Sequence, residues 1–209
     1  MLVPELRYTR NRRVLDVAAR LIDFEARTGT IRELTGLTDS RIRSLSKECG
    51  VDGQSGGKTR HRGASPHSVS SILGKPRTRN EAATLLSLCR LMGLMSGQIS
   101  SGADLGMNRL SRAERLCDVF WTFRYLLPQA AISFEHMLLL LSSAAKAEDM
   151  AIINCADCTA LVVVDALSLY DNLCLHCRSD ESLKEASSKA SYRCVAEESA
   201  AYAPVPSGA

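Results

Sequence analysis

Two pairs of closely spaced cysteines constrain this chain more than any other feature of its sequence. Cys155 and Cys158 form one Cys-x-x-Cys pair, and Cys174 and Cys177 form a second after fifteen intervening residues. Each pair can make a tight turn that aims two thiolates at one point, and an intervening β-hairpin would bring the pairs together. Four soft thiolate ligands close a tetrahedral shell, so the spacing predicts one structural Zn²⁺ ion per chain.

Two other interpretations of the cysteine pairs are open from the residues alone. The pairs could form disulfides or a redox-active site, although a thiol–disulfide enzyme needs one pair at a helix N-terminus in a β-α-β setting, which the pattern lacks. His176 lies between two candidate ligands and could replace one, although a solvent-exposed side chain is the simpler expectation. Residues 1–13 lack the apolar stretch of a secretory signal, so a cytoplasmic, reducing location is expected, where paired cysteines favour metals.

Positive charge is concentrated in the first part of the chain. Residues 1–80 contain 16 Lys and Arg against 8 Asp and Glu, a net charge of +8; the other 10 basic and 15 acidic residues give −5, which together make the total of +3. A basic region of this kind has the electrostatic footprint of a polyanion partner. No apolar run is long enough to span a bilayer, so no membrane partner is expected.

A pattern of two short helices around a glycine turn lies within this basic region. The first is expected over 31–35, Gly36 tolerates the turn conformation, and Thr38 or Asp39 caps a helix that extends to about residue 48. This is the pattern of a helix-turn-helix unit, which either binds DNA or packs within a helical bundle. If it binds DNA, the contacting side chains are those on the outer face of the second helix, where Arg, Lys and Ser suit phosphates and base edges: Ser40, Arg41, Arg43, Ser44 and Lys47.

Residues 53–80 differ in character from the helices before them. They open with a glycine-rich stretch and contain six positive charges and no acidic residue. We interpret them as a flexible basic segment that contacts DNA phosphates, with Lys58, Arg60 and Arg62 as the contacting residues, and a solvated surface loop is the alternative.

The rest of the pattern predicts a mainly α-helical protein. Apolar residues recur at helical spacing over 14–27, 81–94, 111–127 and 133–147, and 160–164 favours a strand. Aromatic residues make up only 5% of the chain, so a core of Leu, Val, Ile and Ala is expected, with three isolated cysteines as small buried side chains: Cys49, Cys89 and Cys117.

These patterns divide the chain into five regions. They are a helical region with the helix-turn-helix (1–52), the basic segment (53–80), a helical core that binds a partner (81–150), the zinc module with its four cysteines (151–178) and a disordered tail (179–209). The four histidines are scattered, and no catalytic arrangement is evident, so the protein is not expected to be an enzyme.

The order of these segments resembles the FlhC family, the C subunit of the bacterial flagellar master transcriptional activator. The resemblance covers roughly residues 14–178. It rests on the segments 20–22, 34–38, 41–48 and 63–66 and on the two cysteine pairs. Two positions depart from the family pattern: Thr159-Ala160 stands where members often have two glycines, and the stretch after Pro66 is serine-rich where members are aromatic.

The resemblance implies a DNA-binding subunit of a transcriptional activator. Such a subunit forms a hetero-oligomer with an FlhD-type partner, binds double-stranded DNA upstream of flagellar promoters and recruits RNA polymerase. It also implies that one zinc ion is held by Cys155, Cys158, Cys174 and Cys177. The alternative from another class is a non-enzymatic, zinc-containing adaptor that binds proteins but not DNA.

Overall fold

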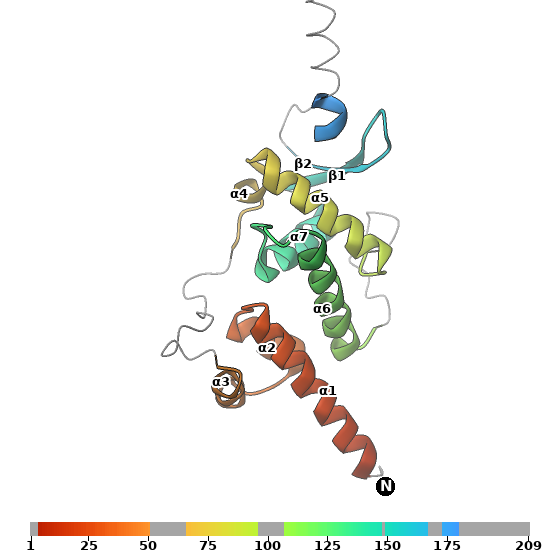
Figure 1. The fold of residues 1–209 in the computed structure, drawn as a ribbon. Helices are drawn as coiled ribbons and strands as arrows, with labels where there is room; N and C mark the ends of the chain where they lie inside the picture. Colours follow the sequence, from red (N-terminus) through yellow and green to blue (C-terminus); the bar gives the residue numbers. More distant parts are fainter. Residues whose placement is uncertain (1–3, 51–65, 96–106, 148, 167–172, 180–209) are drawn as a thin grey trace, which may run out of the picture.

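The computed structural model describes residues 4–50, 66–95, 107–147, 149–166 and 173–179 (Figure 1). The protein is mainly α-helical, as predicted, with a cysteine cluster near its C-terminal end. The helices are α1 (Pro4–Asp23), α2 (Thr28–Thr35), α3 (Asp39–Glu48), α4 (Ser70–Leu73), α5 (Pro76–Leu91), α6 (Arg109–Leu126) and α7 (Phe134–Lys146). Two strands follow them, β1 (Met150–Asn154) and β2 (Leu161–Asp165).

The first helix is longer and starts earlier than the predicted 14–27. It begins at Pro4, a residue that suits the first turn of a helix because it has no N–H to leave unpaired there. It ends at Asp23, and Glu25 adopts a left-handed conformation with φ of 58°. The apolar pattern does not extend to the start of α1 because residues 7–13 are exposed and bury no apolar face.

Helices α2 and α3 form the predicted helix-turn-helix unit. Gly36 ends α2 in the left-handed region with φ of 78°, and the Thr38 hydroxyl accepts a hydrogen bond from the Arg41 amide at the start of α3. A side chain at position 36 would also meet the Arg109 guanidinium, which lies at the end of a flexible side chain and could move aside. Glycine is therefore favoured at this turn for its conformation.

One hydrophobic core joins the helix-turn-helix to the rest of the protein. Its buried residues run from Val17 in α1 to Val163 in β2, and both α1 and α2 pack against α6. All four phenylalanines lie at its centre. The ring centroids of Phe24 and Phe120 are 5.0 Å apart, those of Phe120 and Phe134 are 5.3 Å apart, and those of Phe120 and Phe123 are 6.1 Å apart. The predicted core of Leu, Val, Ile and Ala is confirmed for most of the buried residues, and three buried phenylalanines join it: Phe120, Phe123 and Phe134.

A buried carboxylate from α7 caps the first helix of the helix-turn-helix. The Glu135 side chain is 9% exposed, and its Oε1 accepts hydrogen bonds from the Arg27 amide at 2.9 Å and the Thr30 hydroxyl at 2.8 Å. Arg27 is the N-cap residue of α2 and makes no side-chain cap of its own. The negative charge lies at the positive end of the α2 dipole, which stabilises this contact.

The end of the predicted flexible basic segment is folded. Residues 76–80 are the start of α5, and the Arg79 side chain is 8% exposed, with Nε and Nη2 donating to the Leu73 carbonyl at 3.1 and 2.9 Å. Arg77 pairs with Glu81 across one helical turn, at 3.0 Å. This part of the segment therefore uses its arginines internally. The candidate DNA contacts Lys58, Arg60 and Arg62 lie outside the described residues, as does the predicted tail from residue 180 onward.

Strands β1 and β2 form an antiparallel hairpin in which Met150 pairs with Asp165 and Asn154 pairs with Leu161. Helix α5 packs against β2, and α7 packs against β1. The hairpin is thereby fixed to the helical core on one side, while its far end carries the cysteines (Figure 1). Among the described residues, no helix combines the length and the apolar character needed to cross a membrane.

Candidate metal centre

The first cysteine pair lies in the turn of the β1–β2 hairpin. Cys155 directly follows β1, its amide donates to the Ala160 carbonyl at 2.8 Å, and its carbonyl accepts from the Thr159 amide at 3.0 Å. These bonds fix the knuckle that carries Cys155 and Cys158. The predicted hairpin between the two pairs is not the hairpin that the structure shows: β1 comes before the first pair, and β2 is the one strand in the described part of the intervening segment.

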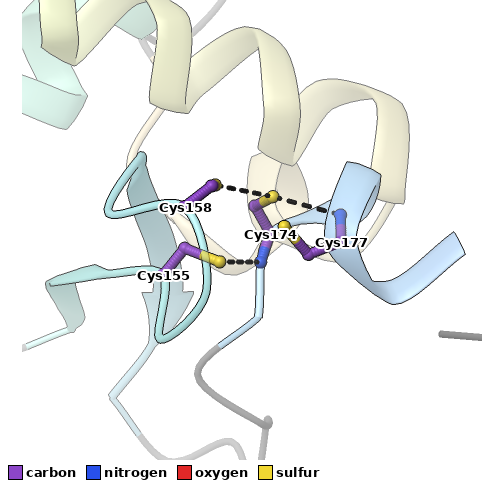
Figure 2. Close-up of side chains that lie close together, drawn as sticks. All are labelled: Cys155, Cys158, Cys174 and Cys177. Atoms are coloured by element: carbon purple, nitrogen blue, oxygen red, sulfur yellow. Dashed lines mark hydrogen bonds between the residues drawn. The ribbon is translucent and has the colours of Figure 1, made fainter. Parts of the chain in front are cut away.

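The second cysteine pair completes the cluster from the other side. Cys174 precedes a helical turn at residues 175–179, and Cys177 lies within that turn (Figure 2). The four sulfur atoms lie within 4.8 Å of one another, and the Sγ atoms of Cys158 and Cys174 are 3.6 Å apart. A tetrahedral thiolate site with metal–sulfur bonds of about 2.3 Å has sulfur–sulfur edges of about 3.8 Å. The cluster therefore has the dimensions of a four-cysteine metal site.

The geometry contains neither a formed disulfide nor a ligating His176 among the described residues. A disulfide requires a sulfur–sulfur bond of about 2.05 Å, and the cysteines of the described residues are all free thiols. His176 is exposed and is not one of the residues whose ligand atoms converge. The four predicted ligands are thus the residues that the structure brings together, and they could hold a metal ion.

Backbone amides and neighbouring thiols shift the ionisation of the cluster in opposite directions. Hydrogen bonds from backbone N–H groups, that of Cys158 first, lower the pKa of Cys155 to about 6. The Cys174 amide also donates to the Cys155 Sγ at 3.3 Å. Hydrogen bonding with the Cys158 and Cys174 thiols raises the pKa of Cys177. One thiolate is therefore favoured, but several together repel one another unless a cation lies between them.

The cysteine cluster packs against the β-hairpin through apolar contacts. Cys155 is 2% exposed and packs in a small cluster with Val162 and Val164, against which Leu173 also packs. Cys158, in contrast, is exposed. One side of the centre is therefore sealed by protein and the other faces solvent, so a bound ion would tie the residue 173–179 segment to the hairpin.

Thr159 is strained at the knuckle, and replacing it with glycine is expected to stabilise the protein. Its φ of 60° lies in the left-handed region, which a β-branched residue rarely adopts. Thr159→Gly should relieve about 1 kcal/mol of this strain and raise the free energy of unfolding by a similar amount. Thermal or denaturant unfolding of the metal-loaded protein measures the change. Thr122→Gly, in the middle of α6, is the matched control and should destabilise instead.

The other described cysteines lie outside the cluster. Cys89 and Cys117 are buried as predicted, and this burial raises the pKa of each thiol to about 12. Cys49 is exposed, so its predicted burial is wrong: it is the C-cap residue of α3, where the helix ends and turns toward solvent. Cys194 lies outside the described residues.

The exposed face of α3 carries the predicted DNA-contacting residues. Ile42, Leu45 and Ser46 are the buried residues of α3. At 100° per residue, the side opposite to them carries Ser40, Arg43, Ser44 and Lys47, while Arg41 lies at its edge. All five of these side chains are exposed.

The comparisons with known proteins identify no relatives. No protein-family model matches the chain, and no curated protein matches it. The fold and the site therefore define this protein by its class alone: a mainly α-helical protein in which a helix-turn-helix and a four-cysteine cluster are joined to one core.

Proposed function

We propose that this protein is a DNA-binding subunit of a transcriptional activator, with the exposed face of α3 as its DNA-contacting surface. The observation that carries the proposal is the separation of the two faces of α3. Its apolar side packs within the three-helix unit of α1, α2 and α3, and its other side presents Arg41, Arg43 and Lys47 to solvent. A second helix of a helix-turn-helix with this arrangement suits the major groove of duplex DNA.

The electrostatics of α3 support a polyanion partner. Arg43 and Lys47 are four residues apart and carry like charges on one helix face, which destabilises an isolated helix. Among the described residues, the ion pair at the start of α3 joins Asp39 to Arg32 of α2 and involves neither Arg43 nor Lys47. The sequence therefore maintains an unneutralised basic face that DNA phosphates would neutralise.

We assign Zn²⁺ to the four-cysteine cluster, as one structural ion per chain. Four thiolates in a tetrahedron favour zinc among the common divalent ions and leave no open position for a substrate. The role of the ion would be to fix the knuckle and the segment at 173–179, which have only a small apolar cluster of their own. The proposed activity is therefore positional and not enzymatic.

Two apolar surfaces of the helical core support a partner subunit of the FlhD type. Trp121 and Tyr125 on α6 are 58% and 72% exposed, and their rings stack with centroids 5.5 Å apart. Exposed Trp and Tyr are typical of the centres of protein interfaces. Half-buried leucines of α7 line a groove of about 680 Å³ that α2 and α6 also border: Leu138, Leu139 and Leu141.

In this proposal, the complex binds upstream of flagellar promoters in the cytoplasm and recruits RNA polymerase. The resemblance of segments 34–38 and 41–48 and of the cysteine pairs to the FlhC family supports this particular role. The basic character of α3 supports the DNA-binding step independently of the resemblance.

Neutralising the α3 face is expected to weaken DNA binding and to reduce its dependence on salt. Arg43→Gln/Lys47→Gln removes two charges, so the slope of log affinity against log salt should fall by about 1.8, provided that both residues contact phosphates. When the salt concentration rises from about 50 to about 200 mM, the affinity of the variant for DNA should therefore fall by a factor about twelve times smaller than that of the unchanged protein. Fluorescence anisotropy of a labelled flagellar-promoter duplex measures this, for the chain co-expressed with an FlhD-type subunit.

Arg90→Gln/Lys146→Gln is the charge-matched control, because these exposed residues close α5 and α7, the helices that pack on the β-hairpin. It should leave the slope unchanged. If the unchanged complex forms but binds no DNA at about 50 mM salt, the activator proposal is wrong and the zinc-containing adaptor becomes the better interpretation.

A further inference from the structure

We propose that the amino-terminal part of α1 is a second DNA-contacting element, which binds phosphates next to the site of α3. Its contacting residues are Arg7 and Arg10, and the proposal rests on the DNA-binding function proposed above. The predicted DNA contacts all came from α3 and from the basic segment that follows it.

The amino-terminal part of α1 has no packing role in the structure. Residues 7–13 are all exposed, including Tyr8 at 70%. The side-chain contacts of α1 with α6 begin at Arg13, which pairs with Glu114 at 2.6 Å, and continue with Arg20 and Asp118 at 2.6 Å. These pairs run in the same direction along both helices, and the amino-terminal end of α1 projects away from the other helices (Figure 1).

The charges of this projecting part oppose its own helical structure. Arg7 and Arg10 are neighbours on one helix face, so their like charges repel each other. Arg7 also lies in the first turn, where the positive end of the helix dipole disfavours a cation. Neither forms an ion pair with a residue in the described part of the chain, and Arg12 beside them forms none either. An external polyanion would reverse both unfavourable terms.

The position of this element favours the DNA that α3 would bind. Helix α1 packs against α3, and both lie at the end of the molecule opposite to the β-hairpin (Figure 1). A helix of 20 residues is about 30 Å long, close to the length of one turn of duplex DNA. With α3 in one groove, the proposal places the projecting part of α1 on phosphates of the same duplex, up to about one helical turn away. Contacts between arginine side chains and phosphates position a protein on DNA but do not select a base sequence.

The test compares Arg7→Gln/Arg10→Gln with Arg7→Lys/Arg10→Lys, each as the full chain co-expressed with the FlhD-type subunit. The probes are the flagellar-promoter duplex and a scrambled duplex of equal length. The glutamine variant should lower the salt slope by about 1.8 on both duplexes, since phosphate contacts are independent of sequence. The lysine variant keeps the charge and should keep the slope. Arg90→Gln/Lys146→Gln again serves as the charge-matched control.

The outcomes separate this inference from the function on which it rests. If the α3 variant weakens binding but the glutamine variant at positions 7 and 10 keeps the full salt slope, the α1 inference is wrong and the proposed function stands. If the unchanged complex binds neither duplex, both are wrong. Phosphatidylserine-containing vesicles test the other polyanion: loss of vesicle binding in the glutamine variant, with DNA binding unchanged, would overturn the assignment to DNA.

The variants are expected to fold, so a change in binding is interpretable. Both positions are exposed and bury no apolar surface, and removing two repelling charges should keep or raise the helical content of α1. Far-ultraviolet circular dichroism and the melting temperature check this for each variant.

Discussion

Replacing Cys155 with serine is expected to release the metal ion and to unfold the β-hairpin while the helices stay folded. Cys155 is the least exposed of the four ligands, and a serine hydroxyl is a poor ligand for a thiophilic ion. A two-stranded hairpin is marginal by itself, and structural zinc sites contribute about 10 kcal/mol or more of apparent binding free energy. Met150 and Val163 belong to the main core, so the base of the hairpin should unfold last.

Metal content by mass spectrometry and amide hydrogen exchange of residues 150–165 measure this outcome. The unchanged protein should contain one zinc ion per chain, and the variant should contain well under one. Cys49→Ser is the matched control, because Cys49 is an exposed thiol outside the cluster, and it should keep both the metal and the protection of the hairpin. One zinc ion per chain in the Cys155 variant would show that the four-cysteine assignment is wrong.

Replacing Phe134 with alanine is expected to destabilise the whole protein by about 4 kcal/mol. Its ring is fully buried and contacts the rings of both Phe24 and Phe120, with centroids 6.0 and 5.3 Å away. The substitution leaves a cavity among α6, α7 and the segment after α1, and it also removes two aromatic contacts. A loss of this size is a large fraction of the stability of an ordinary domain.

Denaturant unfolding followed by circular dichroism measures the effect of Phe134→Ala. Leu91→Ala is the control, because the Leu91 side chain is 85% exposed, and its effect should stay within about 0.5 kcal/mol. If the α1–α3 unit folded independently of α6 and α7, the variant would unfold in two separate transitions. A single transition is expected because Phe24, in the segment after α1, shares the cluster with Phe134.

Local patterns predicted the elements whose causes are local. Gly36 has the predicted left-handed turn and Thr38 caps α3, because each of these effects depends on residues within four positions along the chain. The cysteine spacing likewise predicted which four thiols meet. These predictions needed only the preferences of single residues and the period of the helix.

The features that the sequence did not reveal depend on contacts between distant residues. The cap of α2 comes from Glu135, which is 108 positions from Arg27, and nothing in the pattern distinguishes this glutamate from a solvated one. Arg79 belongs to the segment that was predicted to be flexible and basic, but its side chain is buried and donates two hydrogen bonds to the Leu73 carbonyl. The exposed start of α1 was missed for the opposite reason, since a helix that packs against nothing has no apolar period to detect.

The cap on α2 has a consequence for how this protein could be divided or recombined. The carboxylate that completes the helix-turn-helix belongs to α7, and the phenylalanine rings packed beside it come from α6, α7 and the segment after α1. A fragment of residues 1–52 would lose the cap and expose Phe24, so the DNA-facing helices are not a portable module. Exchange of this surface between related proteins would therefore have to carry the whole helical core with it.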